Sequence, residues 1–172
     1  SIVVTPNGYK AGELYAVVPV PTLGAEAVTN GDFATDTDWT KSAGWTISGG
    51  SANSDGSQSA ASGLVQSSVF TSGKRYKLSF NITSNGAYFK FWVNGSQNIF
   101  STSLVDGLIE YTFTASATGS AYFEATSTFI GSISNVSVKE LTSADMDVTR
   151  ATAATRVDEN GLVNYAEIVG SE

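Results

Sequence analysis

The residues best suited to chemistry form two short alternating runs in the second half of the chain. Tyr88, Lys90 and Trp92 are separated by single residues, and Tyr122 and Glu124 follow the same spacing. Side chains two apart on a β-strand lie on one face of the sheet. Aromatic rings stack on the apolar C–H patches of a sugar, and planar polar groups hydrogen-bond its hydroxyls. The spacing predicts a carbohydrate-binding surface, with one alternative left open: these aromatics pack beneath the flanking segments or against a neighbouring subunit.

A second group of candidate residues gathers hard oxygen donors within one short stretch. Asn30, Asp32, Asp36 and Asp38 carry the amide and carboxylate oxygens that Ca²⁺ prefers. Their spacing lacks the turn glycine and the terminal bidentate glutamate of an EF-hand loop. The alternative is that these residues form turns, a role for which Asp and Asn are well suited.

The sequence offers few candidate residues for acid–base or nucleophilic catalysis. The sequence has no His and no Cys, which removes the usual general base and the thiol nucleophile. No serine stands in a Gly-x-Ser-x-Gly segment. Glycoside hydrolysis needs two carboxylates facing each other, whereas Glu110 and Glu124 alternate with apolar residues and are expected to face solvent. We therefore expect a protein that is not an enzyme.

Composition favours short strands over helices. The 172 residues include 17 Gly, about a quarter are Ser or Thr, and only 15% are charged. Hydroxyl side chains compete for backbone hydrogen bonds and glycine costs backbone entropy, so both disfavour helices and suit strands joined by tight turns. The net charge of −7 argues against a nucleic-acid partner, which needs clustered Lys and Arg. No apolar run approaches the length that spans a bilayer, so we expect no membrane insertion.

Alternation of apolar and polar residues with a period of two dominates from residue 64 onward. It is clearest in four segments, at residues 76–82, 87–93, 109–113 and 121–125. A further strand through Ile133, Val136 and Val138 contains a three-residue step, which predicts a β-bulge. Turn signals stand between the segments, at residues 72–74, 85–86, 94–95, 106–107 and 118–120. Short strands at this spacing are typical of an antiparallel β-sandwich.

The sequence suggests three parts. Residues 1–23 contain two short strands and end in a stiff segment at 19–22, where proline fixes φ and holds its neighbour extended. Residues 24–141 form the sandwich. Residues 142–172 return to short strands, with a hairpin signal at 158–161 between the strands 155–157 and 162–163.

Three ordered motifs of the sandwich segment match a known pattern. They are Thr29-Asn30-Gly31-Asp32-Phe33 followed by Trp39 and Trp45, Gly73-Lys74-Arg75-Tyr76-Lys77-Leu78-Ser79-Phe80, and Ile133-Ser134-Asn135-Val136-Ser137-Val138. Together they resemble the galactose-binding-type jelly roll of carbohydrate-binding modules. The resemblance implies an antiparallel jelly-roll β-sandwich and a carbohydrate ligand. Related modules often hold a structural Ca²⁺, here implied at Asn30, Asp32 and Asn135, but Ala34 and Asn135 replace the two acids expected there. No other cofactor is expected.

The flanks carry a second resemblance. Residues 2–10 and the run Arg150-Ala151-Thr152-Ala153-Ala154-Thr155-Arg156-Val157 are similar to segments of phage tail-fibre and virion-associated proteins. This resemblance implies a homotrimeric adhesion protein of the virion, a portion of a tail or head fibre, whose flanks attach it to other virion proteins and whose jelly roll contacts host-surface glycan. Two alternatives stay open: a structural decoration or connector protein of the virion without a ligand, and a secreted bacterial polysaccharide-binding module.

Overall fold

The computed structural model describes residues 21–142 and two further short strands, β12 (Thr155–Val157) and β13 (Val163–Tyr165). The chain divides into two units, Val20–Ser143 and residues 1–19 with 144–172. Every regular element among the described residues is a β-strand, as the composition predicts. Within this part of the chain no helix is long and apolar enough to cross a membrane.

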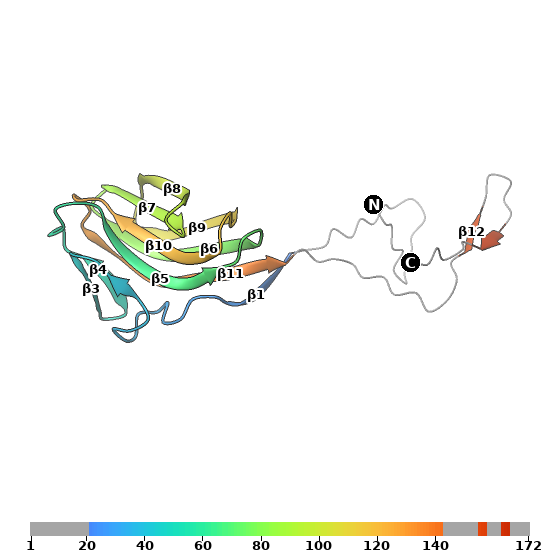
Figure 1. Ribbon diagram of the computed structural model, residues 1–172, viewed down its shortest axis with the longest axis horizontal. Coiled ribbons are helices and arrows are strands. Elements are labelled where there is room, and N and C mark those ends of the chain that lie inside the picture. The colour runs from blue at the N-terminus through green and yellow to red at the C-terminus, as the bar shows by residue number, and fades with distance from the viewer. Residues whose placement is uncertain (1–20, 143–154, 158–162, 166–172) are drawn as a thin grey trace. The chain divides into compact units, whose positions relative to one another are not determined.

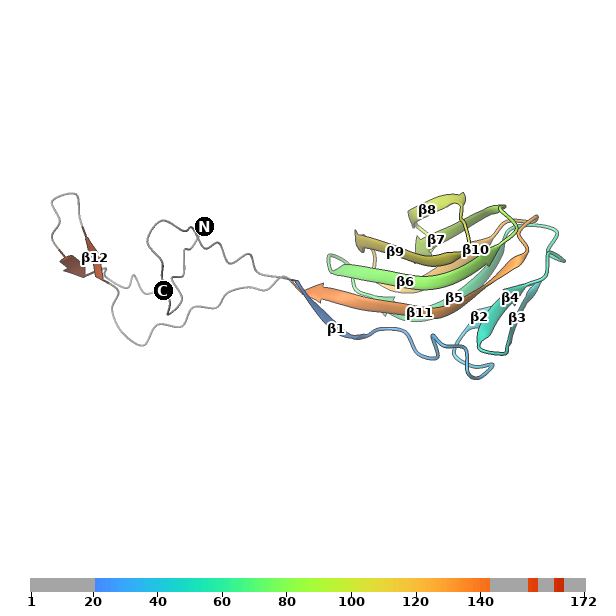
Figure 2. The same ribbon diagram turned by 180° about the vertical axis from the view of Figure 1, so that it is seen from behind.

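Two antiparallel sheets make up the unit Val20–Ser143 (Figures 1 and 2). The six-stranded sheet consists of β1 (Thr22–Glu26), β3 (Trp45–Ser48), β4 (Ser51–Ser54), β6 (Arg75–Ser84), β9 (Gly107–Thr114) and β11 (Gly131–Thr142). Its strand order is β3-β4-β11-β6-β9, and β1 pairs with the far end of β11. The five-stranded sheet consists of β2 (Thr40–Lys41), β5 (Ser62–Phe70), β7 (Tyr88–Val93), β8 (Gln97–Ser103) and β10 (Gly119–Ala125). Its order is β2-β5-β10-β7-β8.

The path of the chain between the sheets defines the topology. From β4 to β7 each strand lies in the opposite sheet from the one before it, β7 and β8 pair as a hairpin, and β9 to β11 alternate again. The result sets the four strands β4-β11-β6-β9 against β5-β10-β7-β8. This is the eight-stranded jelly roll, so the expected fold class is confirmed.

Aromatic side chains fill the space between the two sheets. Phe80 and Phe123 come from opposite sheets, are fully buried, and have ring centroids 5.3 Å apart with near-perpendicular planes. Such edge-to-face pairs add about 0.5–1.5 kcal/mol to the gain from burial alone. Trp39 and Trp45 are 5% exposed and donate through Nε1 to the carbonyls of Asn30 and Ser62, so both belong to the core.

The alternation in the sequence predicts the inward faces correctly. The apolar residues of β6, β7 and β10 at alternate positions are buried, whereas those of β9 are half-buried because that strand lies at the sheet edge. The predicted bulge in β11 is present between Ser134 and Ser137. Asn135 lies within it at φ +51°, a left-handed conformation that Asn tolerates better than most residues.

Turns and short strands were predicted with mixed success. Asn94 and Gly95 both have positive φ, and Ser96 N–H donates to the Val93 carbonyl at 3.0 Å, as expected for an Asn-Gly hairpin turn. The alternation did not reveal β8, whose polar residues outnumber its apolar ones, or the short hairpin of β3 and β4. The segment interpreted as a linker ends earlier than expected, since Thr22 already pairs with Thr142.

The second unit contains one described feature, the antiparallel pairing of β12 with β13. Thr155 lies opposite Tyr165 and Val157 opposite Val163, in agreement with the hairpin that the sequence predicts around residues 158–161. The strands predicted within residues 1–20 lie outside the described residues.

Candidate functional site: a polar-aromatic platform

The five residues singled out for carbohydrate binding lie on two neighbouring strands of the five-stranded sheet. In the pairing of β7 with β10, Trp92 lies opposite Tyr122 and Lys90 opposite Glu124. The intervening residues of both strands are buried in the core, so these side chains occupy the outer face of the sheet. We call this group, completed by Tyr88, the polar-aromatic platform.

An ion pair ties the two strands of the platform together. Lys90 Nζ lies 2.6 Å from Glu124 Oε1, and the two side chains are 27% and 11% exposed. The same ammonium lies 6.0 Å from the centre of the Trp92 ring, within the range of a cation–π interaction. Lys90 therefore contacts both a carboxylate and an indole, and it fixes their positions relative to each other.

The expectation that Glu124 faces solvent is wrong, although the expectation for Glu110 holds. Both carboxylates point outward from their sheets, but Glu110 is 48% exposed and Glu124 only 11%. The difference follows from strand position, because β10 has neighbours on both sides whereas β9 is an edge strand. Glu124 lies between Lys90 of β7, which pairs with it, and Gly63 of β5, against which the Tyr122 ring lies. Glu110 stays exposed on the edge strand.

Tyr122 depends on a glycine in the adjacent strand. A Cβ atom on Gly63 of β5 would lie 2.1 Å from Cε2 of the Tyr122 ring, so the ring lies against the backbone of β5 at a point where only hydrogen fits. Burial raises the pKa of the Tyr122 phenol, the Glu124 carboxylate raises it further, and Lys90 acts in the opposite direction. Gly63 was not recognised from the sequence, because a glycine in a strand signals a close approach without naming its partner.

Exposure differs strongly across the platform. Tyr88 at the start of β7 is 57% exposed, whereas Trp92 and Tyr122 are half-buried. Trp92 Nε1 is covered and has no acceptor among the described residues. An indole N–H is a donor only, so a small displacement of this ring would offer an unmet donor to an incoming hydroxyl oxygen.

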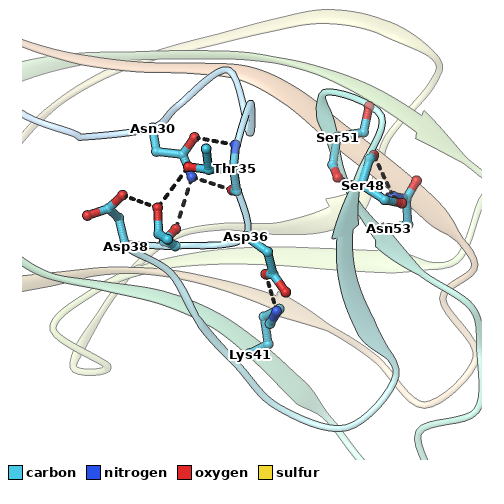
Figure 3. Close-up of polar contacts among 9 residues, drawn as sticks. Asn30, Thr35, Asp36, Asp38, Lys41, Ser48, Ser51 and Asn53 are labelled. Carbon is cyan, nitrogen blue, oxygen red and sulfur yellow. Dashed lines mark hydrogen bonds and ion pairs between the residues drawn. The ribbon is translucent and has the colours of Figure 1, made fainter.

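The oxygen-rich loop before β2 is held together by its own hydrogen bonds (Figure 3). Asn30 Nδ2 donates to the carbonyls of Thr35 and Thr37 at 2.7 and 2.9 Å, and its Oδ1 accepts from the Thr35 N–H. Asp36 forms an ion pair with Lys41. The Asp38 carboxylate accepts from the Thr37 hydroxyl at 2.7 Å. These contacts are the turn-forming role that the sequence offered as the alternative to metal binding.

The three residues proposed for calcium come from two segments that meet. Val136 N–H, next to Asn135, donates to the carbonyl of Gly31 at 2.8 Å, which brings the β11 bulge against the loop that contains Asn30 and Asp32. One Asp32 oxygen accepts from Ala34 N–H at 3.3 Å. Among the residues that the structure describes, no three His, Cys, Asp or Glu side chains gather as metal ligands would.

Among the solved structures that resemble the chain is a phage tailspike domain. The chain is similar to the enzymatically active domain of tailspike protein 4 of bacteriophage CBA120, with 17% sequence identity and a TM-score of 0.47 over 67% of this chain. It spans about a fifth of that chain's length, since the match covers 21% of it. At this TM-score the likeness carries no inference about function. No family model and no curated protein matches the sequence.

The groups on the platform suit sugar binding. Its single carboxylate, Glu124, is engaged by Lys90, whereas glycoside hydrolysis uses two carboxylates. Two half-buried rings, one exposed ring and an ion pair offer stacking surfaces, donors and acceptors on one face. That combination is what a pyranose ring, with apolar faces and equatorial hydroxyls, can contact.

Proposed function

We propose that this chain is an adhesion module of a phage virion, part of a tail or head fibre, and that the polar-aromatic platform binds carbohydrate on the host surface. The similarity of both flanks to virion proteins supports the first part of this proposal. Homotrimeric assembly belongs to the same proposal, and it would multiply a weak single site through avidity. We further propose that the module binds its ligand without turning it over.

The observation that carries the carbohydrate proposal is the convergence of the platform residues. Residues 88–92 and 122–124 are distant in sequence, yet the structure pairs Trp92 with Tyr122 and Lys90 with Glu124 across adjacent central strands. Tyr88 leaves 57% of its surface open beside them. Three aromatic rings around an ion pair on an outer sheet face suit the apolar faces and hydroxyls of a sugar.

The experiment is a glycan array probed with the 172-residue chain and with two variants. Tyr88→Ala removes the exposed ring and should leave the fold intact, and it is expected to weaken binding about tenfold, in line with the 1–3 kcal/mol that stacking contributes per aromatic face. Trp92→Ala is expected to abolish detectable binding. Leu108→Ala, a change of similar exposure on the other sheet, serves as the control and should bind like the parent.

Three results would contradict the proposal. Binding that survives both aromatic substitutions would place the ligand elsewhere on the chain. No binding to any glycan, with the parent chain correctly folded, would favour the structural alternative. Release of sugar fragments from a bound glycan would contradict binding without turnover.

The structural alternative, a decoration or connector protein without ligand, has one observation in its favour. The strongest polar groups of the platform already satisfy each other, since Lys90 and Glu124 are paired at 2.6 Å. A platform of this kind could support a sister chain as readily as a sugar. Multi-angle light scattering bears on the third possibility, because a monomer would fit a secreted bacterial module better than a fibre.

A structural Ca²⁺ at Asn30, Asp32 and Asn135 is also a proposal. The β11 bulge and the Asn30 loop are in contact, and all three side chains carry oxygen donors suited to this ion. Calcium at millimolar concentration should raise the Tm of the chain, and Asp32→Ala should remove that increase. An unchanged Tm would leave these residues with turn formation alone.

A further inference from the structure

One end of the six-stranded sheet carries most of the positive charge of the described sandwich. Of the six basic residues within 21–142, four lie at the end of this sheet where β6 begins and β11 ends: Lys74, Arg75, Lys77 and Lys139. The same range holds nine acidic residues, so its net charge is 6 − 9 = −3. Clustering of cations in an otherwise acidic domain calls for a physical reason.

Two of these lysines face each other directly. Lys77 of β6 and Lys139 of β11 are cross-strand partners, and the next outward pair is Ser79 with Ser137. Like charges at directly opposed positions of a sheet disfavour folding. Both side chains are half-buried, so solvent screens their repulsion only in part. A sheet selected for stability alone would place an acid at one of these positions.

The opposed lysines line a hollow, and a larger one adjoins it. The first, of 140 Å³, is bounded by Leu23, Lys77, Ser79, Ser137 and Lys139. The second, of 480 Å³, lies one step along the same strands and is bounded by Pro21, Gly73, Lys74, Arg75, Glu140, Leu141 and Thr142. Its volume is within the range of small-ligand sites. Both lie at this end of the sheet, and we call their combined lining the basic track.

Three carboxylates lie beside the basic track and neutralise part of its charge. Glu140 pairs with Lys74 at 2.8 Å, and Glu110 pairs with Lys77 at 2.7 Å. Glu26 accepts from the Ser137 hydroxyl and the Val138 N–H, each at 2.6 Å. Arg75 and Lys139 have no carboxylate within 4 Å among residues 21–142. Each hollow therefore contains one cation without such a partner.

This lining fits one class of ligand. One free cation in each hollow, surrounded by hydroxyls, carboxylates and the apolar Leu23 and Leu141, suits a chain with one negative charge per sugar and several hydroxyls between charges. A nucleic acid fits poorly, because a continuous phosphate backbone would meet the three carboxylates. No aromatic residue lines either hollow to stack a base.

We propose that the basic track is a second carbohydrate site, which binds an acidic polysaccharide through Lys139 and Arg75. It lies on the opposite sheet from the polar-aromatic platform and does not depend on it. The interaction is charge-assisted, so its affinity falls as salt rises.

The test is isothermal titration of the 172-residue chain with oligogalacturonate, which carries one carboxylate per sugar, and with a neutral dextran of matched length. Lys139→Gln and Arg75→Gln are each expected to weaken oligogalacturonate binding about tenfold, as the loss of one charge-assisted hydrogen bond does. Lys139→Gln should not lower the Tm, because it relieves a like-charge contact. Lys41→Gln on β2 of the five-stranded sheet, outside both proposed sites, is the matched control and should bind like the parent. The variants that test the two sites change different residues, so failure here and failure of the platform are distinguishable.

Several results would overturn the proposal. Equal binding of dextran would show that charge is not recognised. Equal binding of single-stranded DNA of the same charge would show a nonspecific polyanion surface, and no binding of oligogalacturonate in low salt would show that there is no site. A lower Tm for Lys139→Gln would assign the lysine a structural role instead.

Discussion

The ion pair between Lys90 and Glu124 allows a quantitative test of how burial changes the strength of a surface interaction. The pair is 2.6 Å long, and the carboxylate side chain is 11% exposed. A hydrogen bond to a charged group contributes about 1.5–3 kcal/mol when covered. Because Lys90 keeps 27% of its side chain exposed, solvent screening lowers the expected coupling to about 1–2 kcal/mol.

The perturbation is a double-mutant cycle of Lys90→Gln, Glu124→Gln and the two together. Each single change leaves the other charge on the sheet without its partner. Lys90→Gln is expected to lower the free energy of unfolding more, because it leaves the covered Glu124 carboxylate unpaired. The free energy of unfolding is measured in urea by tryptophan fluorescence. All three tryptophans of the chain, Trp39, Trp45 and Trp92, belong to the unit Val20–Ser143, so the signal reports its unfolding.

The chain provides a matched control on its other sheet. Lys77 and Glu110 form a pair at 2.7 Å, with side chains 36% and 48% exposed. The chemistry and the distance are almost the same, and the two pairs differ strongly in coverage. They also differ in their neighbours, since Lys77 faces Lys139 and Lys90 lies near the Trp92 ring. Exposed pairs couple by about 0.2–1 kcal/mol. Equal coupling energies in the two cycles, or a smaller one for Lys90 with Glu124, would refute the argument that the five-stranded sheet covers its ion pair.

Three further predictions concern single residues. Raising the pH above 10 should lower the free energy of unfolding through Tyr122. Burial and then the Glu124 carboxylate raise the pKa of its phenol, so the unfolded chain loses that proton at lower pH than the folded chain does. The difference in phenolate titration between the parent and Tyr122→Phe gives the pKa of Tyr122, and Glu124→Gln should lower that pKa. Gly63→Ala should lower the free energy of unfolding by about 1–3 kcal/mol, since the new Cβ would lie 2.1 Å from the Tyr122 ring. Gly24→Ala, where the nearest atom is 3.4 Å away, should leave the free energy of unfolding unchanged. Equal effects of the two substitutions would show that the ring does not need the glycine. Asn135→Gly should be tolerated at φ +51°, whereas Asn135→Val should cost about 1–2 kcal/mol in urea unfolding; similar stabilities would mean that the bulge is not strained.

The fold was predictable because three independent signals agree. Alternation from Tyr76 onward separates inward from outward residues, the turn residues stand between these segments, and the step from Ile133 to Val136 marks the bulge. Each signal rests on local backbone geometry, which the sequence encodes directly. The strand β8 lacked such a signal, because it lies at a sheet edge and buries only part of its apolar set.

The composition of the platform was predictable, but its geometry was not. Alternation correctly predicted that Lys90 and Trp92 point outward from one strand, and that Tyr122 and Glu124 point outward from another. It could not state that the two runs are neighbours in register, because strand order depends on how the whole chain packs. The contact of the Tyr122 ring with Gly63 joins two strands, so it too depends on strand order.

The contrast between Glu110 and Glu124 shows where sequence periodicity ends as a guide. Both acids alternate with core residues, and periodicity assigns both to an outer face. The solvent exposure of a residue on such a face depends on the strands on either side of it. In the jelly roll β10 lies between β5 and β7, while β9 has β6 on one side only. Glu124 lies opposite Lys90 of β7, which pairs with it, and opposite Gly63 of β5, against which the neighbouring Tyr122 ring lies. A carboxylate covered in this way needs a charged partner at the opposing position. Oppositely charged pairs on the outer faces of central strands can be found only when the strand order is known. The sequence does not give that order, and the structure does.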